Sequence, residues 1–464
     1  MPFWSRIKPI ETAHSDAGRL KRTLSWPHLV ALGVGAIVGA GIYALIGQGA
    51  GMAGPGVVVS FAIAGVICAC ASLAYAELAT MMPAAGSAYT YTYATLGELI
   101  AWIVGWALIL EYTVVVSAVA VGWSGYAAGF LNGAGVAIPQ QFELGALHFN
   151  PLAVFIIFVV AGLLILGTRE SATVNAALVV LKLLALGLFL ALTLPHFDAR
   201  HFSPFAPFGW GAEAHGAGKV GIAAAAAIIF FAFYGFDAVS TAAEECKNPK
   251  RDLAIGIVGS MAICTAIYMA VGAAAIGAMD FHVFAPSGEP IALIVRSLGY
   301  PAAAAFIGAA AVIAIPTVIL GFLYGQTRIF FVMARDGLLP RALGDVHAKL
   351  GTPVVVTLFT ALVCSVLAGL LTLGEIAALA NAGTLAAFIA VSIALLVLRV
   401  RDPKRPRPFR APFAWVIAPV AVCGCLYLFA SLSEGTIARF FIWMAIGLPI
   451  YLLWGARKSA LAKP

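Results

Sequence analysis

The chain has 464 residues, of which 62% are hydrophobic and only 10% are charged, and its mean hydropathy is +1.01. Soluble domains carry roughly 45–50% apolar and about 25% charged residues, so this composition excludes a water-soluble globular protein. The net charge of +7 does not indicate a nucleic-acid partner, because the basic residues gather beside hydrophobic segments, as in RVRDPKRPRPFR at Arg399–Arg410. Such clusters favour membrane topology and contact with anionic lipid.

Hydrophobic segments long enough to cross a bilayer recur along almost the whole chain. A helix that crosses about 30 Å of hydrocarbon needs roughly 20 mostly apolar residues, and the sequence predicts about twelve such spans. In chain order they are Leu29–Gln48, Gly56–Thr80, Glu98–Leu131, Leu152–Leu166, Ala172–Leu194, Val220–Ala243, Leu253–Ala278, Ala302–Ala334, Val354–Leu373, Ile376–Leu398, Phe413–Leu432 and Ile437–Leu453. We therefore expect an all-α polytopic membrane protein.

The basic residues also predict how the chain is oriented in the cell membrane. With both termini in the cytoplasm, about 22 Lys and Arg residues lie inside and roughly 4 lie outside, and Lys182 is left within the membrane. This asymmetry predicts a cytoplasmic N-tail at 1–28 and a cytoplasmic C-tail at 454–464, around one membrane transport domain that covers 1–464. Six of the seven cysteines fall inside predicted spans, so no disulfide framework, metal site or cofactor is indicated.

Two predicted spans carry interruptions. The first span contains GVGAIVGAGIY at Gly33–Tyr43, and the sixth contains FAFYGF at Phe231–Phe236. They occupy corresponding positions in two five-span halves, as the broken helices of an inverted-repeat transporter do. A broken helix frees N–H and C=O groups that cannot stay unpaired in hydrocarbon, and an amino-acid zwitterion can satisfy both kinds. The glycines alone are equally consistent with close helix packing, because Gly35 and Gly39 have GxxxG spacing.

Four segments in order along the chain carry a specific resemblance. They are LGVGAIVGAGIY (Leu32–Tyr43), FFAFYGFDAVST (Phe230–Thr241), KNPKRDLAI (Lys247–Ile255) and YGQTRIFFVMARDGLLP (Tyr324–Pro340). Together they resemble the cationic amino acid transporter family of the amino acid-polyamine-organocation (APC) superfamily. The resemblance implies secondary active transport of amino acids, not an enzyme. It also implies a LeuT-like fold, with inverted repeats at 29–194 and 220–400 and two peripheral helices within 413–453.

The resemblance further places the substrate at the breaks of the first and sixth spans. It assigns the carboxylate to backbone amides near Gly39, Ala40 and Gly41, and the ammonium to carbonyls near Ile37, Phe231, Ala232 and Tyr234. The substrate class stays open between cationic and small neutral amino acids, because no acidic receptor for a side chain can be placed.

Ionisable residues inside the predicted spans are candidates for ion coupling. Lys182 lies midway along the fifth span, where a lysine costs about 2.5–3.5 kcal/mol on insertion scales and is by default a functional hypothesis. The resemblance places Lys182 where sodium-coupled relatives hold an ion, which favours proton coupling over a structural role. Glu111 in the third span is a weaker candidate for a proton relay, with structural hydrogen bonding as the alternative. Asp237 is expected to fix the broken sixth helix.

Several alternatives remain open at this point. An exchanger or uniporter on the same fold would use Lys182 only to lock helices, whereas a symporter would use it to carry protons. A channel filter or a metalloenzyme motif such as H-E-x-x-H does not occur. Glu244 and Glu245 could pair with Arg251 and Arg335 as an inner gate, although a solvated charged face is favoured. The expected partners are an amino acid, the proton and membrane lipid; an accessory subunit stays undecided.

Overall fold

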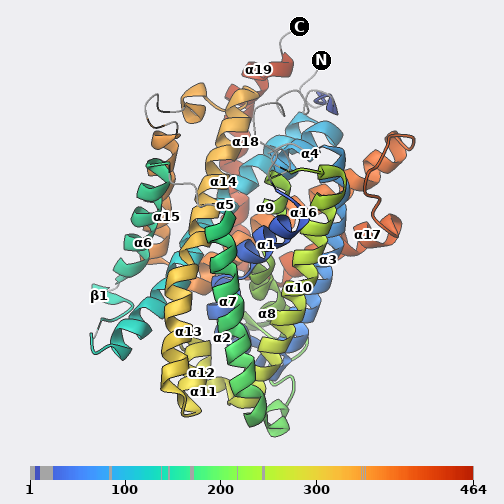
Figure 1. Cartoon of the computed structure of the whole chain (residues 1–464). Helices are drawn as coiled ribbons and strands as arrows, with labels where there is room; N and C mark the ends of the chain where they lie inside the picture. The colour runs from blue at the N-terminus through green and yellow to red at the C-terminus, as the bar shows by residue number, and fades with distance from the viewer. Residues whose placement is uncertain are drawn as a thin grey trace.

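The structure is a computed structural model, and it describes residues 6–10, 24–82, 86–136, 138–144, 147–167, 172–216, 218–242, 246–345, 347, 350 and 352–462. Helices make up most of this part of the chain (Figure 1). Strands are confined there to two short antiparallel ribbons. In one, β1 (Phe142–Leu144) pairs with β2 (Leu147–Phe149), and in the other, β3 (Glu213–His215) pairs with β4 (Gly218–Val220).

The helices follow one another along the chain with short connections. The α-helices are α1 (Trp26–Ile37), α2 (Ala40–Ala53), α3 (Val57–Met81), α4 (Ser87–Thr95), α5 (Glu98–Gly133), α6 (Pro151–Ile165), α7 (Ala172–Thr193), α8 (Ile222–Ile229), α9 (Phe236–Thr241), α10 (Pro249–Ala278), α11 (Phe281–Phe284), α12 (Pro290–Ser297), α13 (Pro301–Ala314), α14 (Pro316–Arg335), α15 (Val354–Leu370), α16 (Leu373–Arg401), α17 (Ala414–Ser431), α18 (Glu434–Ile450) and α19 (Ala456–Lys458). Short 3₁₀ or π turns are η3 (Gly54–Gly56), η4 (Leu194–His196), η5 (Ala199–Phe202), η6 (Phe230–Phe233), η8 (Arg341–Gly344), η9 (Tyr451–Gly455) and η10 (Ala460–Ala462).

Among the described residues, eight helical segments are long and apolar enough to cross a membrane. They are Ala40–Met81, Glu98–Gly133, Ala176–His196, Pro249–Ala278, Pro301–Arg335, Leu373–Arg401, Ala414–Ser431 and Glu434–Lys458. Shorter apolar helices occupy Trp26–Ile37, Pro151–Ile165, Ile222–Phe233 and Val354–Leu370. Each predicted span therefore has a helical counterpart, and the chain is a multi-pass membrane protein.

The eighth predicted span corresponds to one apolar helical segment, Pro301–Arg335, whose α-helical winding is disturbed at a single residue, Ile315. The sequence pattern predicts one helix over Ala302–Ala334, but α13 ends at Ala314 and α14 begins at Pro316. Proline has no N–H to donate and its ring collides with the preceding turn, so a helix is interrupted or kinked where it occurs. The disturbance lies just before Val318 and Phe322, the α14 residues that line the candidate site.

Helix α5 forms the centre of the molecule. Every residue from Val104 to Ala128 is buried, so the helix is covered on all sides by α14, α16, α2 and their neighbours. By contrast, α17 and α18 expose large apolar side chains such as Trp415 and Phe441, which is typical of helices at a lipid-facing edge. Figure 1 shows α17 at one edge and α6 and α15 at another, around α1, α2, α7 and α10.

Residues from both ends of the chain meet at one end of the molecule. The Arg6 guanidinium donates to the carbonyl of Ala456 (2.8 Å) and pairs with Glu98 (3.1 Å). The Lys8 ammonium pairs with Asp336 at the end of α14 (2.8 Å). Helices α11 and α12 lie at the opposite end (Figure 1).

Candidate functional site

The first interruption separates α1 from α2. The backbone leaves the helix at Val38, which is extended (φ −74°, ψ 97°), and passes through Gly39 before α2 begins at Ala40. The first N–H groups of a helix have no partner within that helix, and the helix dipole adds a partial positive charge around them. The start of α2 therefore presents main-chain donors from Ala40 and Gly41 in the interior of the protein.

The second interruption lies between α8 and α9. The α-helical winding of α8 changes to a 3₁₀ turn at η6, the chain extends at Tyr234, and α9 begins at Phe236. Gly235 has φ +108°, a conformation that L side chains rarely adopt. A Cβ atom at Gly235 would also lie 2.7 Å from the carbonyl carbon of Ala36 on α1. Glycine is therefore required at this position for two independent reasons.

The two interruptions contact each other directly. A Cβ atom at Gly41 would lie only 2.4 Å from the Cα atom of Ala232, so the backbone of α2 passes against the backbone of η6. A Cβ atom at Gly39 would lie 3.0 Å from Cγ2 of Val318 on α14. Small residues at these positions thus bring three elements, distant in sequence, to one point.

A small cavity lies where these elements meet. Its volume is about 10 Å³, which is enough for roughly one water molecule. Its lining consists of Ala36, Ile37, Gly39, Ala40, Gly41, Val115, Val119, Phe231, Tyr234, Val318 and Phe322. All of the predicted substrate residues except Ala232 are in this lining, and Ala232 packs behind Gly41. The protein is therefore closed around the point that the sequence indicates.

Carbonyl groups at the two interruptions already have some partners. The Tyr268 hydroxyl donates to the carbonyl of Ile37 (2.8 Å), and the N–H of Tyr234 donates to the carbonyl of Phe231 (3.3 Å). A carbonyl oxygen has two lone pairs and can accept a second hydrogen bond. Both oxygens can therefore accept an additional donor that enters the cavity.

Lys182 lies beside the first interruption, although it does not line the cavity. Its side chain is 1% exposed, and its ammonium donates to the carbonyl of Gly35 (2.9 Å) and to the hydroxyl of Thr317 (3.2 Å). The Tyr43 hydroxyl donates to the backbone carbonyl of Lys182 (3.0 Å). The lysine thus connects α7 with α1, α2 and the start of α14.

Glu111 and Asp237 lie on the side of the second interruption. Glu111 on α5 is 2% exposed, and its Oε2 atom has no hydrogen-bond partner among the described residues. Asp237 is in the first turn of α9, and its carboxylate accepts from the Tyr112 hydroxyl (3.3 Å). Neither carboxylate lines the cavity, so neither is placed to contact a ligand held there.

Three residues of the site were not predicted from the sequence. Tyr268 and Thr317 bind groups at the first interruption, and Asn381 on α16 binds groups on both sides of the second. Each is a polar residue inside a mostly apolar segment, and buried polar groups in native proteins are nearly always hydrogen-bonded. That signal could have selected them as candidates, but it could not have named their partners.

The basic segment at the end of α16 and in the loop after it differs from its expected role in one respect. Arg399 and Arg407 do not face lipid but bind the carboxylate of Glu77 on α3, which is 0% exposed (Nε–Oε1 distances 2.8 and 3.0 Å). The sequence could not indicate this because more than three hundred residues separate the partners. Lys404 and Arg405 remain at the surface.

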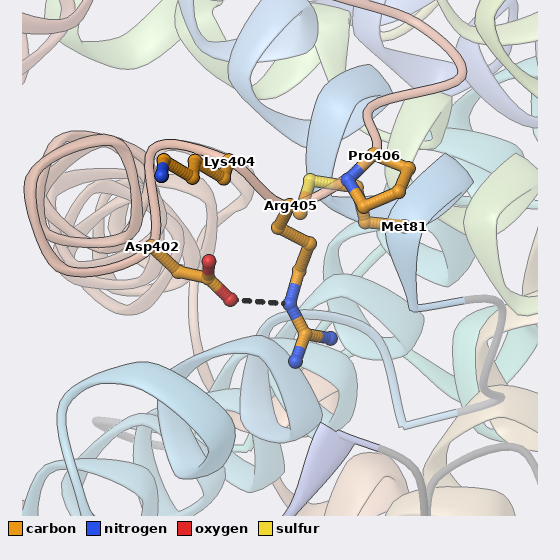
Figure 2. Close-up of a pocket in the computed structure, with 5 residues that line it drawn as sticks. All are labelled: Met81, Asp402, Lys404, Arg405 and Pro406. Atoms are coloured by element: carbon orange, nitrogen blue, oxygen red, sulfur yellow. Dashed lines mark hydrogen bonds and ion pairs between the residues drawn. The ribbon is translucent and has the colours of Figure 1, made fainter.

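A larger cavity of about 470 Å³ lies at this loop and is lined by Met81, Asp402, Lys404, Arg405 and Pro406. Figure 2 shows the Arg405 side chain directed at Asp402, with Nε and Oδ2 2.7 Å apart. The cavity contains no group from either helix interruption. We therefore place the candidate site at the smaller, buried cavity.

Other predicted features can be located only in part. Glu244 and Glu245 lie outside the described residues, so the proposed inner gate is untested. Arg251 is exposed, and the Arg335 guanidinium lies over the ring of Phe331 at 5.9 Å from its centroid. The seven cysteines are free. The described part of the chain contains no group of His, Cys, Asp or Glu side chains that could hold a metal ion.

Comparison with known proteins gives a consistent family. A family model described as amino acid permease matches residues 24–451. The chain is 45% identical to the branched-chain amino acid permease BcaP of Bacillus subtilis, over 98% of this chain and 97% of that protein. It is 39% identical to the methylthioribose transporter of Bacillus subtilis, over 99% of both chains. It is also 38% identical to the vacuolar cationic amino acid transporter 2 of Arabidopsis thaliana, over 87% of this chain and 64% of that protein.

These likenesses extend over the helices that build the cavity and over almost the whole chain. The apolar helices and the family assignment agree that the protein acts in a membrane as a permease and not as an enzyme. The chain therefore belongs to the amino acid permease family of the APC superfamily.

Proposed function

We propose that this protein is a proton-coupled symporter that carries neutral aliphatic amino acids into the cell by alternating access. The observation that carries the proposal is the meeting of two interrupted helices at one buried cavity. N–H groups at the start of α2 can donate to a carboxylate, and the carbonyls of Ile37 and Phe231 can accept from an ammonium. One small zwitterion satisfies both sets of groups.

The proposed frame is LeuT-like and has about twelve spans, of which the first and sixth are the interrupted ones. Residues 29–194 and 220–400 would form the inverted repeats, and α17 and α18 would be peripheral. Their exposed apolar faces support that position. In the cell membrane, with both termini cytoplasmic, rocking of one repeat-derived helix group against the other would open the closed cavity to each side in turn.

The lining of the cavity supports a neutral aliphatic side chain as the preferred cargo. Val115 and Val119 from α5 and Val318 and Phe322 from α14 supply its apolar walls. None of the described lining residues is Asp or Glu, so a cationic side chain would lose water without gaining a counter-ion. The relative that is 45% identical is a branched-chain amino acid permease, which agrees with this assignment.

Lys182 is the proposed proton carrier. Its ammonium holds the carbonyl of Gly35 and the hydroxyl of Thr317, so in its charged form it ties α1 to α14 across the base of the first interruption. Charge-assisted hydrogen bonds are stronger than neutral ones. Loss of the proton would weaken this tie and allow α1 to move, which links protonation to the opening of the cavity.

Uptake into proteoliposomes tests the proposal. With an inside-alkaline gradient, the wild type should accumulate leucine and valine above equilibrium, and a protonophore should abolish the accumulation. Arginine should not accumulate. The Lys182→Ala variant should still equilibrate leucine but should not concentrate it. Lys250→Ala, which removes an exposed lysine, is the matched control and should behave as the wild type.

Two results would overturn parts of the proposal. Full gradient-driven accumulation by Lys182→Ala would remove Lys182 from the coupling mechanism. Counterflow by the wild type that persists without any pH gradient and moves no protons would instead establish an exchanger or a uniporter.

A further inference from the structure

Asn381 is a fully buried polar residue in an otherwise apolar part of α16. It lies in ALANAGTLAAF at Ala378–Phe388, and its side chain is 0% exposed. A primary amide offers two donors and an acceptor oxygen, and burying them without partners is unfavourable. The partners of these hydrogen bonds therefore indicate the role of Asn381.

Both amide donors bind the end of α8. Nδ2 donates to the carbonyl of Ala227 (2.5 Å) and to the carbonyl of Ile228 (2.9 Å). In a continuous α-helix these carbonyls would accept from the N–H groups four residues later. The change to 3₁₀ winding at Phe230 shifts that pairing by one residue. Asn381 thus supplies donors where the interruption disturbs the main-chain ladder.

The amide oxygen binds a side chain beyond the interruption. It accepts from the hydroxyl of Tyr234, whose ring lines the cavity and lies 5.0 Å from the ring of Phe231. The reverse amide orientation would face an oxygen toward two carbonyl oxygens, so the assigned orientation is the only one in which all three contacts are favourable. One side chain therefore holds both sides of the break.

A second contact of α16 reinforces the same arrangement. Phe388 lies two turns after Asn381 on the same face of the helix. Its ring packs against Phe230 before the break (5.8 Å between centroids) and against Phe236 after it (5.1 Å). Helix α16 therefore packs against the interrupted helix on both sides of the break.

We infer that Asn381 is a positioning residue for the substrate's side chain: it does not line the cavity, but it fixes the Tyr234 ring that does. The inference rests on the proposed function, because it assumes that the substrate lies at the two interruptions. Without the bond to Asn381, the Tyr234 ring can turn into the space that a branched side chain occupies. Large substrates are then affected more than small ones.

The test measures KM and kcat for leucine and for alanine in proteoliposomes, per folded transporter. Asn381→Leu keeps the branched side-chain skeleton and removes all three hydrogen bonds, whereas Tyr234→Phe removes only the bond to the Tyr234 hydroxyl. We expect Asn381→Leu to raise KM for leucine about tenfold and KM for alanine less. Tyr234→Phe should also raise the ratio of KM for leucine to KM for alanine. The double variant should add nothing to Asn381→Leu, because both changes remove the same contact.

Ser392→Ala is the matched control. It removes a buried hydroxyl from the same helix, and the Ser392 hydroxyl has no hydrogen-bond partner among the described residues. It should leave both KM values unchanged.

A purely structural role for Asn381 predicts different results. Asn381→Leu would then reduce the folded amount or kcat and leave the KM ratio unchanged, and its effects would add to those of Tyr234→Phe. Either result overturns the inference. If Asn381→Leu does not fold, wild-type selectivity in Tyr234→Phe alone is sufficient to overturn it. Failure of the wild type to transport amino acids would instead count against the proposed function.

Discussion

Gly41 and Gly235 show how single residues allow two interrupted helices to meet. At Gly41 the nearest neighbour is backbone, the Cα atom of Ala232, which cannot move aside as a flexible side chain can. Gly235 combines a positive φ with a close approach to Ala36. Both positions lie in the motifs that the sequence analysis identified. At both, the absence of a side chain allows another segment of backbone to approach closely.

Replacing Gly41 with alanine tests this requirement. The added Cβ atom would lie 2.4 Å from Ala232 Cα, so α2 and η6 must separate. We expect a loss of about 1–3 kcal/mol in stability and a fall in leucine uptake of at least about tenfold. Thermal unfolding in detergent and proteoliposome uptake measure the two effects. Gly321→Ala on α14 is the control, because a Cβ atom there would meet no atom of the described residues outside its own helix within 4 Å.

The sequence predicted the site at residue level only in part. The glycine pattern of the first span and the FAFYGF segment of the sixth identified where the two helices are interrupted. They could do so because an interruption within hydrocarbon requires residues, such as glycine, that tolerate non-helical backbone. The glycines could not by themselves exclude simple helix packing. Asn381 and Tyr268 were missed because their partners, Ile228 and Ile37, lie more than one hundred residues away along the chain. Such contacts depend on how whole helices pack.

At the scale of elements, a buried charge cluster links α3 to the C-terminal end of α16 and to the loop that follows it. Glu77 on α3 accepts from the guanidinium groups of Arg399 and Arg407 and from the N–H of Ala411 (2.8 Å). The cluster fixes the C-terminal end of α16 and the loop that leads to α17. It lies apart from the residues that line the buried cavity.

Glu77→Gln should therefore affect stability much more than substrate affinity. Removing one partner of a buried ion pair leaves the other charges uncompensated, and we expect a loss of about 3–5 kcal/mol. The melting temperature of the purified protein should fall, while KM for leucine stays unchanged in the protein that remains folded. Glu434→Gln, at an exposed carboxylate, should change neither quantity. An unchanged melting temperature for Glu77→Gln would show that the cluster does not hold these elements together.

Element positions were more predictable than element ends and partners. Hydrophobic runs located the long apolar helices, because their length and apolarity are set by the bilayer, but they did not indicate short helices such as α4 and α12. The span over Pro301–Arg335 was predicted as one segment, but the local disturbance before Pro316 was not, because the apolar pattern continues through it. The inward orientation of Arg399 and Arg407 was also missed, since local composition cannot distinguish a lipid-facing arginine from one that is paired with a distant carboxylate.

At the scale of the whole molecule, the central feature is a closed cavity between two interrupted helices. A volume of about 10 Å³ is too small for an amino acid, so binding requires the cavity to expand. Composition and the recurring hydrophobic segments predicted the multi-pass architecture. They could not predict this closed arrangement, because the balance between closed and open states depends on small differences in packing free energy.

The most direct test asks whether both charged ends of the substrate are needed for binding. Ligand-induced stabilisation of the purified protein would be compared for leucine, leucinamide, the keto acid of leucine and isopentylamine. If main-chain groups bind both charged ends, leucine should stabilise the protein most strongly. Each modified ligand should bind at least roughly tenfold more weakly than leucine. Equal stabilisation by leucinamide or by the keto acid would contradict the account, because one end of the zwitterion would then contribute nothing.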